Sequence, residues 1–307
     1  MRVGLIDVDG HNFPNLPLMK ISAFHKREGD AVEWYRGILS DHMHRVYMSQ
    51  VFSFTPDYEW AIDADEIVKG GSGYAISLEN GREAYHKERD NDLPDEVEHI
   101  YPDYSLYGIE DTAYGFLTRG CPRGCGFCHV ADKEGRCSHK VANLDEFWKG
   151  QRNIVLNDPN LLASPDHKDL LTQLADSKAT VEFNQGLDVR LISDDNLELL
   201  QRVKLRHIHF AFDRWQDKDI IEPKLRAFKE ATGYNRGKGD VMVYILVNYD
   251  TTIEQDIYRI QLCRELNFAP YPMIYDKEHC DPIYKKLQRW CNNFIFWRCP
   301  TFEEYMG

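Results

Sequence analysis

Six short apolar runs alternate with helical patterns from Ala113 onward in this chain of 307 residues. The runs are AYGFLT (113–118), NIVLN (153–157), TVEFN (180–184), HIHFAF (207–212), VMVYILV (241–247) and PYPMIY (270–275). Each run is rich in β-branched or aromatic residues, which is typical of strands buried on both faces. Strands that alternate with helices favour a parallel sheet, so these units predict a sheet curled into a partial (β/α)6 barrel. We expect its chemistry at the carboxyl ends of the strands.

Three helix starts lie between these runs. Asn143, with Glu146 three residues later, has the pattern of a capping box. Ser164 followed by Pro165 is typical of an N-cap and a proline at the first helical position. Thr252 precedes a third amphipathic segment, so we expect helices to begin at all three places.

The N-terminal part predicts a separate, Rossmann-like α/β unit. RVGLIDV (2–8) and RVYMSQVF (45–52) have strand patterns, and LPLMKISAFHKREG (16–29) between them has a helical pattern. ADEIVKGGSGY (64–74) predicts another strand that ends in a glycine-rich turn. The charged stretch 80–104 predicts a linker, with Pro94 and Pro102 as breakers.

The expected organisation therefore has three parts. A Rossmann-like domain of the cobalamin-binding type occupies 1–95, a barrel occupies 96–276, and a helical extension occupies 277–307. In the extension, Leu287 and Trp290 recur at helical spacing with other large apolar residues, which indicates packing rather than cofactor contact.

Charge and hydropathy narrow the location and the partners. No run of about 18 apolar residues is present, so we expect no membrane span and no membrane partner. The N-terminal segment is too acidic for a signal peptide, which favours a cytoplasmic protein. The net charge of −13 disfavours a broad nucleic-acid surface but leaves room for a local basic pocket.

The stretch RGCPRGCGFCH (119–129) holds three of the eight cysteines. A reducing compartment disfavours a disulfide framework, so the clustering of Cys121, Cys125 and Cys128 indicates a metal site. Thiolates select zinc and iron–sulfur clusters. A closed structural site needs four protein ligands, whereas three thiolates on a cubane cluster leave one iron open to a cofactor or substrate.

The loop around these cysteines permits two interpretations. Gly120, Gly124 and Gly126 would let the backbone wrap a bulky cluster. Alternatively, His129 would complete a zinc site in a non-catalytic zinc-binding module, although zinc sites usually draw their second ligand pair from a distance.

Cys-x3-Cys-x2-Cys, with Phe127 before the last cysteine and a first strand before the loop, resembles the signature of the radical S-adenosylmethionine (radical SAM) superfamily. The resemblance covers about 110–276. It implies a [4Fe-4S] cluster on Cys121, Cys125 and Cys128, with S-adenosylmethionine chelating the fourth iron next to Phe127. One electron, from a donor such as flavodoxin or ferredoxin, would cleave the S–C5′ bond and give a 5′-deoxyadenosyl radical. The substrate would be a peptide, a tRNA or a small molecule, and the enzyme a transferase or another radical-based modifying enzyme.

The same resemblance assigns S-adenosylmethionine contacts near the strand ends. Asn157 and Asp158 follow the second strand, Gln185 and Arg190 lie at the third, and Asp213 follows the fourth. The alternative for each is a charged strand end or a salt bridge.

DGHNFP (9–14), SQV (49–51) and GGSG (70–73) resemble the signature of cobalamin-binding domains. The resemblance implies His11 as lower axial ligand, Asp9 as the residue that orients it, and Gly70 and Gly71 beside the cofactor. Pro14 stands where that family has glycine. The alternatives are thus cobalamin-dependent methylation and a remnant domain that serves substrate recognition.

The remaining cysteines allow weaker hypotheses. Cys280, Cys291 and Cys299 either hold an auxiliary cluster or are buried structural thiols. Cys137, nine residues past the cluster motif, would donate a hydrogen atom or contact substrate.

Overall fold

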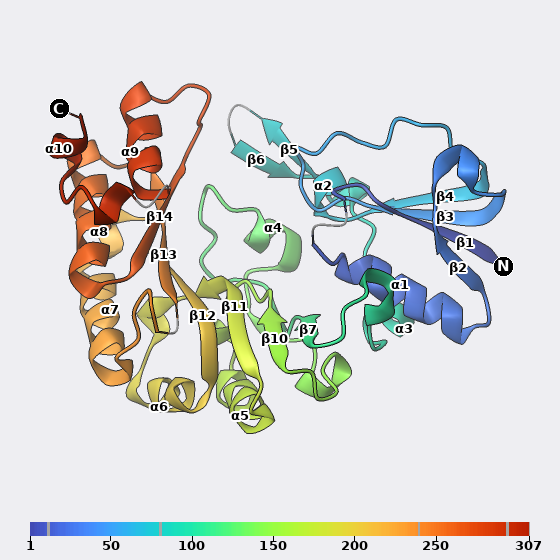
Figure 1. Cartoon of the computed structure of the whole chain (residues 1–307), viewed down its shortest axis with the longest axis horizontal. Coiled ribbons are helices and arrows are strands. Elements are labelled where there is room, and N and C mark those ends of the chain that lie inside the picture. The colour runs from blue at the N-terminus through green and yellow to red at the C-terminus, as the bar shows by residue number, and fades with distance from the viewer. Residues whose placement is uncertain (11–12, 80–81, 239, 293–294, 307) are drawn as a thin grey trace.

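The computed structural model describes residues 1–10, 13–79, 82–238, 240–292 and 295–306. Figure 1 shows an N-terminal unit beside a larger unit, with the two chain ends on opposite sides of the molecule. Both units are mixed α/β, and each is built on a parallel sheet. No helix in the described ranges is long and apolar enough to cross a membrane.

The N-terminal unit contains a four-stranded parallel sheet in the order β2-β1-β3-β4. Its elements are β1 (Arg2–Asp7), α1 (Leu16–Arg27), β2 (Ala31–Trp34), η1 (Gly37–Leu39), β3 (Met43–Ser49) and β4 (Ala64–Gly70). The predicted strands and the helix are therefore present, whereas β2 was not predicted because it is short and half exposed. The order reverses at β1, and such a switch point is where open α/β sheets commonly bind ligands.

The described part of the stretch 80–104, which we expected to be a linker, contains several short helices and a strand. Its elements, with those just before it, are α2 (Ser72–Ala75), β5 (Ile76–Glu79), β6 (Arg82–Tyr85), η2 (Lys87–Arg89), α3 (Asp95–Glu98) and η3 (Tyr104–Tyr107). β5 and β6 pair as an antiparallel hairpin, and Val97 of α3 is buried against α1. The sequence did not predict these elements because they are short and rich in charged residues. Their support comes from contacts with other parts of the fold.

The larger unit contains a six-stranded parallel sheet in the order β14-β13-β12-β11-β10-β7. Its strands are β7 (Thr112–Gly115), β10 (Asn153–Leu156), β11 (Thr180–Leu187), β12 (Lys204–Ala211), β13 (Val241–Val247) and β14 (Ala269–Ile274). All six correspond to the predicted runs. The order never reverses along the chain, so right-handed crossovers place the connecting helices on one face, as Figure 1 shows for α5 to α8.

The connections between these strands agree only in part with the predicted helix starts. They comprise β8 (Thr118–Arg119), α4 (Val130–Glu134), β9 (His139–Lys140), η4 (Leu144–Glu146), η5 (Leu161–Ala163), α5 (His167–Ser177), η6 (Val189–Leu191), α6 (Asp194–Arg202), η7 (Trp215–Asp217), α7 (Lys218–Thr232) and α8 (Ile253–Leu266). Thr252 caps α8 as predicted. Asn143 forms its capping box, but it opens only a single 3-10 turn. The prediction for Ser164 was wrong, because the N-cap of α5 is Asp166.

The C-terminal extension packs into the core of the larger unit. It contains α9 (Pro282–Asn292), η8 (Ile295–Trp297) and α10 (Phe302–Met306). Leu287 and Trp290 are fully buried in the same apolar cluster as the strands of the large sheet, which confirms the expected packing role. Phe294, one of the other large apolar residues expected to pack in this extension, lies outside the described residues.

Candidate functional site

The cysteine loop leaves the large sheet at the carboxyl end of β7 and is closed at its base by a small ladder. β8 pairs with β9, which brings Arg119 opposite His139. Within the loop, the Cys121 amide donates to the Gly135 carbonyl at 3.1 Å and the Cys128 amide donates to Cys125 at 3.0 Å. The three cysteines therefore lie on one loop that is held by backbone hydrogen bonds. This loop is at the carboxyl end of the sheet, where parallel α/β folds place their catalytic residues.

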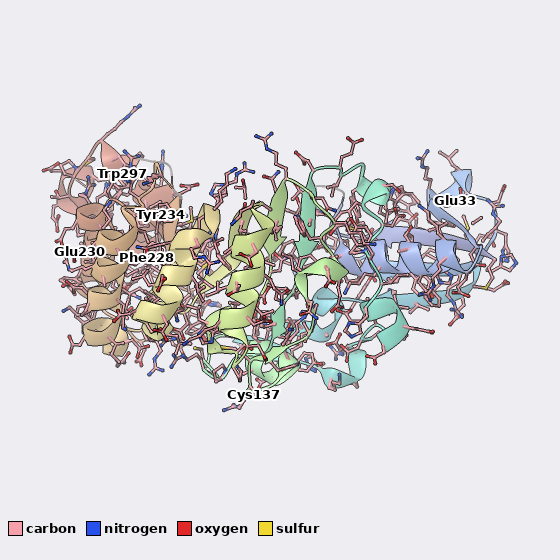
Figure 2. The ribbon with its side chains drawn as sticks, turned by 90° about the horizontal axis from the view of Figure 1, so that it is seen from below. Glu33, Cys137, Phe228, Glu230, Tyr234 and Trp297 are labelled. Carbon is pink, nitrogen blue, oxygen red and sulfur yellow. The ribbon has the colours of Figure 1, made fainter. Side chains whose placement is uncertain are left out.

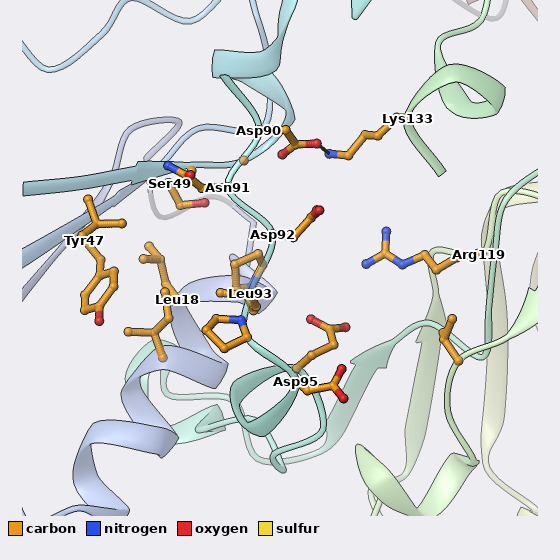
Figure 3. A pocket seen from close by; sticks show the side chains of 18 of the residues that line it. Leu18, Tyr47, Ser49, Asp90, Asn91, Asp92, Leu93, Asp95, Arg119 and Lys133 are labelled. Atoms are coloured by element: carbon orange, nitrogen blue, oxygen red, sulfur yellow. Dashed lines mark ion pairs between the residues drawn. The ribbon is translucent and has the colours of Figure 1, made fainter. Parts of the chain in front are cut away.

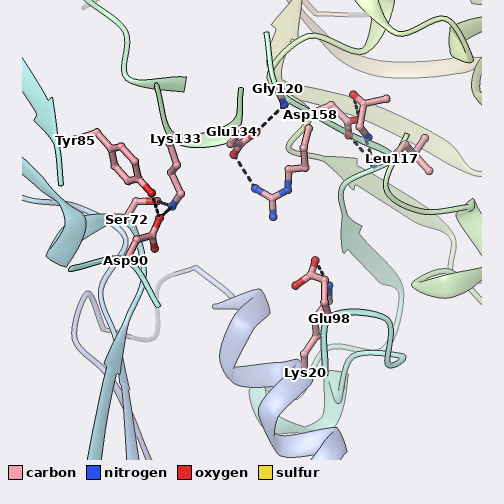
Figure 4. A network of polar contacts seen from close by, with 12 residues as sticks. Lys20, Ser72, Tyr85, Asp90, Glu98, Leu117, Gly120, Lys133, Glu134 and Asp158 are labelled. Carbon is pink, nitrogen blue, oxygen red and sulfur yellow. Dashed lines mark hydrogen bonds and ion pairs between the residues drawn. The ribbon is translucent and has the colours of Figure 1, made fainter. Parts of the chain in front are cut away.

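Asp158, at the end of β10, fixes the chain just before this loop. Its buried carboxylate accepts the amide hydrogens of Leu117 and Thr118, and the Thr118 hydroxyl donates to Oδ1 at 2.7 Å (Figure 4). Burial raises its pKa to about 6, although these hydrogen bonds oppose the shift. Asp158 thus has a structural role in the chain itself, and the predicted cofactor contact stays a prediction.

The raised pKa of Asp158 predicts a pH dependence of stability. In the unfolded chain this carboxyl titrates near 3.8, so between about pH 4 and pH 6 the folded state binds the additional proton. The free energy of unfolding of the wild type, relative to Asp158→Asn, should therefore fall by roughly 3 kcal/mol as the pH rises from 3.5 to 7. Urea unfolding at several pH values measures this difference, and a constant difference would contradict the buried-carboxyl assignment.

Glu134 and Gly120 hold the two ends of the cysteine loop together. Glu134 accepts the Gly120 amide at 3.0 Å and Arg119 Nη1 at 2.9 Å. Gly120 has a φ of +82°, and a Cβ there would lie 2.2 Å from the Cys137 carbonyl oxygen. Glycine is therefore required at this turn.

The three thiols influence one another electrostatically. Burial raises the pKa of Cys125, negative charge on Cys121 and Asp213 raises it further, and Arg190 and Arg214 oppose the shift. Burial also raises the pKa of Cys128 to about 11, a shift that a backbone hydrogen bond from Val130 opposes. Cys125 and Cys128 therefore favour the protonated thiol until a cation stabilises the thiolate.

The thiols are not arranged as a ready-made metal centre. In the part of the chain that the structure describes, no three histidine, cysteine or acidic side chains converge closely enough to hold a metal ion. His129, the alternative fourth zinc ligand, instead places Nδ1 2.7 Å from Glu83 Oε2 on β6. Binding of a cluster would have to draw the cysteine side chains together.

The side chain of Asn160 has hydrogen-bonding groups that suit a bound cluster or cofactor. Its Nδ2 donates to Cys121 Sγ at 3.4 Å, and N–H···S bonds of this kind tune iron–sulfur clusters. Its Oδ1 is buried and has no hydrogen-bond partner among the described residues. Because buried acceptors are seldom left unpaired, this atom marks a place where a donor is missing. The sequence pattern did not indicate Asn160, although this residue lies two positions after Asp158.

Two of the predicted S-adenosylmethionine residues lie within electrostatic reach of the cysteine loop. Arg190 and Asp213 both act on the Cys125 thiol. Arg190 is held by Asp188 Oδ1 at 2.7 Å and Asp217 Oδ2 at 2.5 Å, so its alternative role as a salt-bridge residue is also realised.

The other predicted contacts have separate surroundings. Asn157 Oδ1 accepts Asn184 Nδ2 at 2.9 Å, and the Gln185 side chain is exposed. The Phe127 ring meets the Tyr249 ring edge to face, with centroids 5.0 Å apart. Tyr249 follows β13 and also approaches Gly126, a contact that the sequence did not reveal because it joins distant segments.

Arg259 on α8 organises the strand ends that carry Asp213. It is fully buried, pairs with Asp256, and donates to the carbonyls of Phe212, Asp213 and Leu246. The carboxylate of Asp213 in turn accepts the Leu246 amide at 2.9 Å, and burial raises its pKa. This interior cation fixes the backbone at the carboxyl ends of β12 and β13.

The residues proposed for cobalamin are engaged by the N-terminal unit itself. Asp9 accepts the amides of Val51 and Phe52 and the Thr55 hydroxyl. A Cβ on Gly71 would lie 2.3 Å from the Gln50 carbonyl oxygen, so chain packing accounts for this glycine.

Gly70 lies at the end of β4, where a Cβ would be 3.4 Å from the Asn91 carbonyl oxygen. His11 lies outside the described residues. The contacts of Asp9, Gly70 and Gly71 within the described residues are all explained without a bound corrin.

The cysteines other than Cys121, Cys125 and Cys128 have different surroundings. Cys291 is buried, which agrees with a structural thiol, whereas Cys280 and Cys299 are partly exposed and donate to nearby carbonyls. Cys137 lies exposed at the surface, as Figure 2 shows.

No protein-family model matches the chain, and no curated protein matches it. Among solved structures, the chain is similar to the Streptococcus suis SuiB bound to S-adenosylmethionine, with a TM-score of 0.42 and 15% sequence identity. The match covers 68% of this chain and 53% of that chain, about half of its length.

Proposed function

We propose that this protein is a radical S-adenosylmethionine enzyme built on a partial (β/α)6 barrel. The observation that carries the proposal is a loop with three cysteines, closed by the β8–β9 ladder and by the bond from the Gly120 amide to Glu134, at the carboxyl end of the first strand of a sequentially ordered parallel sheet. Cys121, Cys125 and Cys128 would hold a [4Fe-4S] cluster. When bound, the cluster would supply the electron that cleaves S-adenosylmethionine.

The surrounding residues have definable tasks in this proposal. Asn160 donates to Cys121 Sγ, and its unpaired Oδ1 offers an acceptor to a bound cofactor. Arg190 and Asp213 supply a cation and a carboxylate near Cys125, which suit the carboxylate and the amino or hydroxyl groups of S-adenosylmethionine. Asp158 and Glu134 hold the base of the loop through hydrogen bonds to the amides of Leu117 and Gly120.

Anaerobic reconstitution with iron and sulfide tests the proposal. The expected result is close to four irons per chain, and 5′-deoxyadenosine should form when dithionite and S-adenosylmethionine are added. A protein that takes up zinc but no iron would favour the zinc-binding module, and the enzyme assignment would fall.

Arg190→Met should weaken S-adenosylmethionine binding by at least tenfold while the iron content stays unchanged. The physical reason is the loss of a half-buried cation beside the cofactor site. Isothermal titration of the reconstituted protein measures the affinity, and Arg202→Met, which removes an exposed ion pair with Asp176, is the control. Unchanged affinity in Arg190→Met would leave Arg190 as a salt-bridge residue only.

Cobalamin-dependent methylation remains the alternative within this class, and it rests on the sequence resemblance around Asp9 and His11. Gel filtration after incubation with hydroxocobalamin tests it. Retention of a stoichiometric corrinoid would favour it, and complete loss would favour the remnant domain.

A further inference from the structure

A cavity of about 750 Å³ separates the N-terminal unit from the segment that follows the cysteine loop (Figure 3). Its walls come from α1, from the carboxyl ends of β3 and β4, from the stretch 90–99, and from α4 with the β8–β9 ladder. This volume is in the range of small-molecule sites. Its lining includes none of the three loop cysteines, but it shares Arg119 and Glu134 with the support of that loop and Gly70 and Gly71 with the residues considered for cobalamin.

Arg119 and Lys133 line this cavity on the side of the cysteine loop. Lys69 and Lys140 also line it, and they pair with Asp57 and Asp169. Arg119 stacks on the Phe116 ring, with Cζ 3.4 Å from the ring centroid, and it uses Nη1 to bind Glu134. The stack and the single ion pair hold the guanidinium in place while its other N–H groups face the cavity (Figure 3). Lys133 binds Ser72 Oγ at 2.6 Å and lies 3.6 Å from Asp90.

Carboxylates and an apolar surface face these cations from the N-terminal unit. Asp92 and Asp95 lie across the cavity from Arg119 (Figure 3). The exposed carboxylate of Asp95 has no hydrogen-bond or ion-pair partner among the described residues, whereas the exposed Asp92 pairs with Lys87 at 2.9 Å. Leu93 and Pro94 supply accessible apolar surface in the lining, whereas Leu18 is fully buried.

We propose that this cavity is a second ligand site that takes a small zwitterion with an apolar portion, such as an amino acid or a dipeptide. A carboxylate of the ligand binds Arg119, its ammonium group binds Asp95, and its side chain packs on Leu93 and Pro94. A polyphosphate fits poorly, because the acidic side chains Asp90, Asp92, Asp95, Glu98 and Glu134 also line the cavity.

The cavity also contacts the support of the cysteine loop. Arg119 and Glu134 join the two ends of that loop, and Lys133 joins α4 to the N-terminal unit (Figure 4). A ligand bound at Arg119 therefore contacts the Arg119–Glu134 pair, which holds the Gly120 amide next to Cys121.

Titration of the full-length protein with the twenty amino acids, glycyl-L-leucine and L-leucylglycine, by ligand-observed NMR and then calorimetry, tests the proposal. At least one of these zwitterions should bind saturably, while 4-methylpentanoate and isoamylamine, each with one charge, should bind at least tenfold more weakly. Failure of every zwitterion at 10 mM (about a hundredfold weaker than a typical metabolite site) would overturn the proposal, as would equal binding of a single-charge compound.

Variants locate the binding. Arg119→Met and Asp95→Asn should each weaken binding at least tenfold, whereas Asp195→Asn, at an exposed ion pair with Lys168, should not change it. Asp95→Asn serves as the second test because Arg119 also supports the loop. Binding should persist in Cys125→Ala protein, so a failure of the cluster assignment and a failure of this site are distinguishable. Binding that survives both Arg119→Met and Asp95→Asn would place the ligand elsewhere.

Discussion

Cys125→Ala is expected to abolish the iron–sulfur absorbance and the cleavage of S-adenosylmethionine together. A cubane cluster held by three thiolates loses one of its protein ligands in this variant, and His129, which follows Cys128, is engaged with Glu83. Cys125 also lies close enough to Cys121, Asp213 and Arg190 for their charges to affect it. We therefore expect at least a thousandfold fall in 5′-deoxyadenosine formation, or about 4 kcal/mol, measured after anaerobic reconstitution.

Cys137→Ala is the matched control for this variant. Cys137 is exposed and lies nine residues after Cys128, so its loss should leave the iron content and the absorbance unchanged. Intact cleavage in Cys125→Ala, or equal loss in both variants, would contradict the assignment of the three ligands.

Arg259→Met should cost about 3–5 kcal/mol of the free energy of unfolding, the magnitude expected when one partner of a buried ion pair is removed. The substitution would leave Asp256 as an unpaired interior carboxylate and would strip hydrogen bonds from the carbonyls of Phe212, Asp213 and Leu246. Urea unfolding followed by circular dichroism measures the effect. Because these carbonyls lie at the ends of β12 and β13, binding of S-adenosylmethionine should weaken as well.

Arg226→Met controls for the removal of an arginine from the surface of a helix. Arg226 is about half exposed and pairs with Glu222 and Glu265, so its loss should cost less than about 1 kcal/mol. If the two variants lose similar stability, Arg259 does not organise the strand ends as described.

The sequence predicted the large sheet well because each of its strands carries a run of apolar residues that is buried on at least one face. The run 241–247 coincides with β13, where five of seven residues are buried. The first run, 113–118, breaks after Gly115 because Asp158 captures the amides of Leu117 and Thr118. That contact joins residues forty positions apart, and no local pattern contains it.

The candidate site was predictable only where its residues share one loop. Cys121, Cys125 and Cys128 stand out by spacing alone, but Asn160, Arg259 and the cavity at Arg119 depend on contacts between distant segments. The hairpin β5–β6 escaped prediction for a similar reason, since its support comes from the larger fold and from the contact of Glu83 with His129.

Electron paramagnetic resonance of the reconstituted, dithionite-reduced protein, recorded with and without S-adenosylmethionine, tests the central claim most directly. The account predicts the signal of a reduced [4Fe-4S] cluster that changes shape when S-adenosylmethionine is added, because the cofactor binds at the iron that the three cysteines leave open. A silent sample that contains zinc, or a cluster signal that S-adenosylmethionine leaves unchanged, would contradict it.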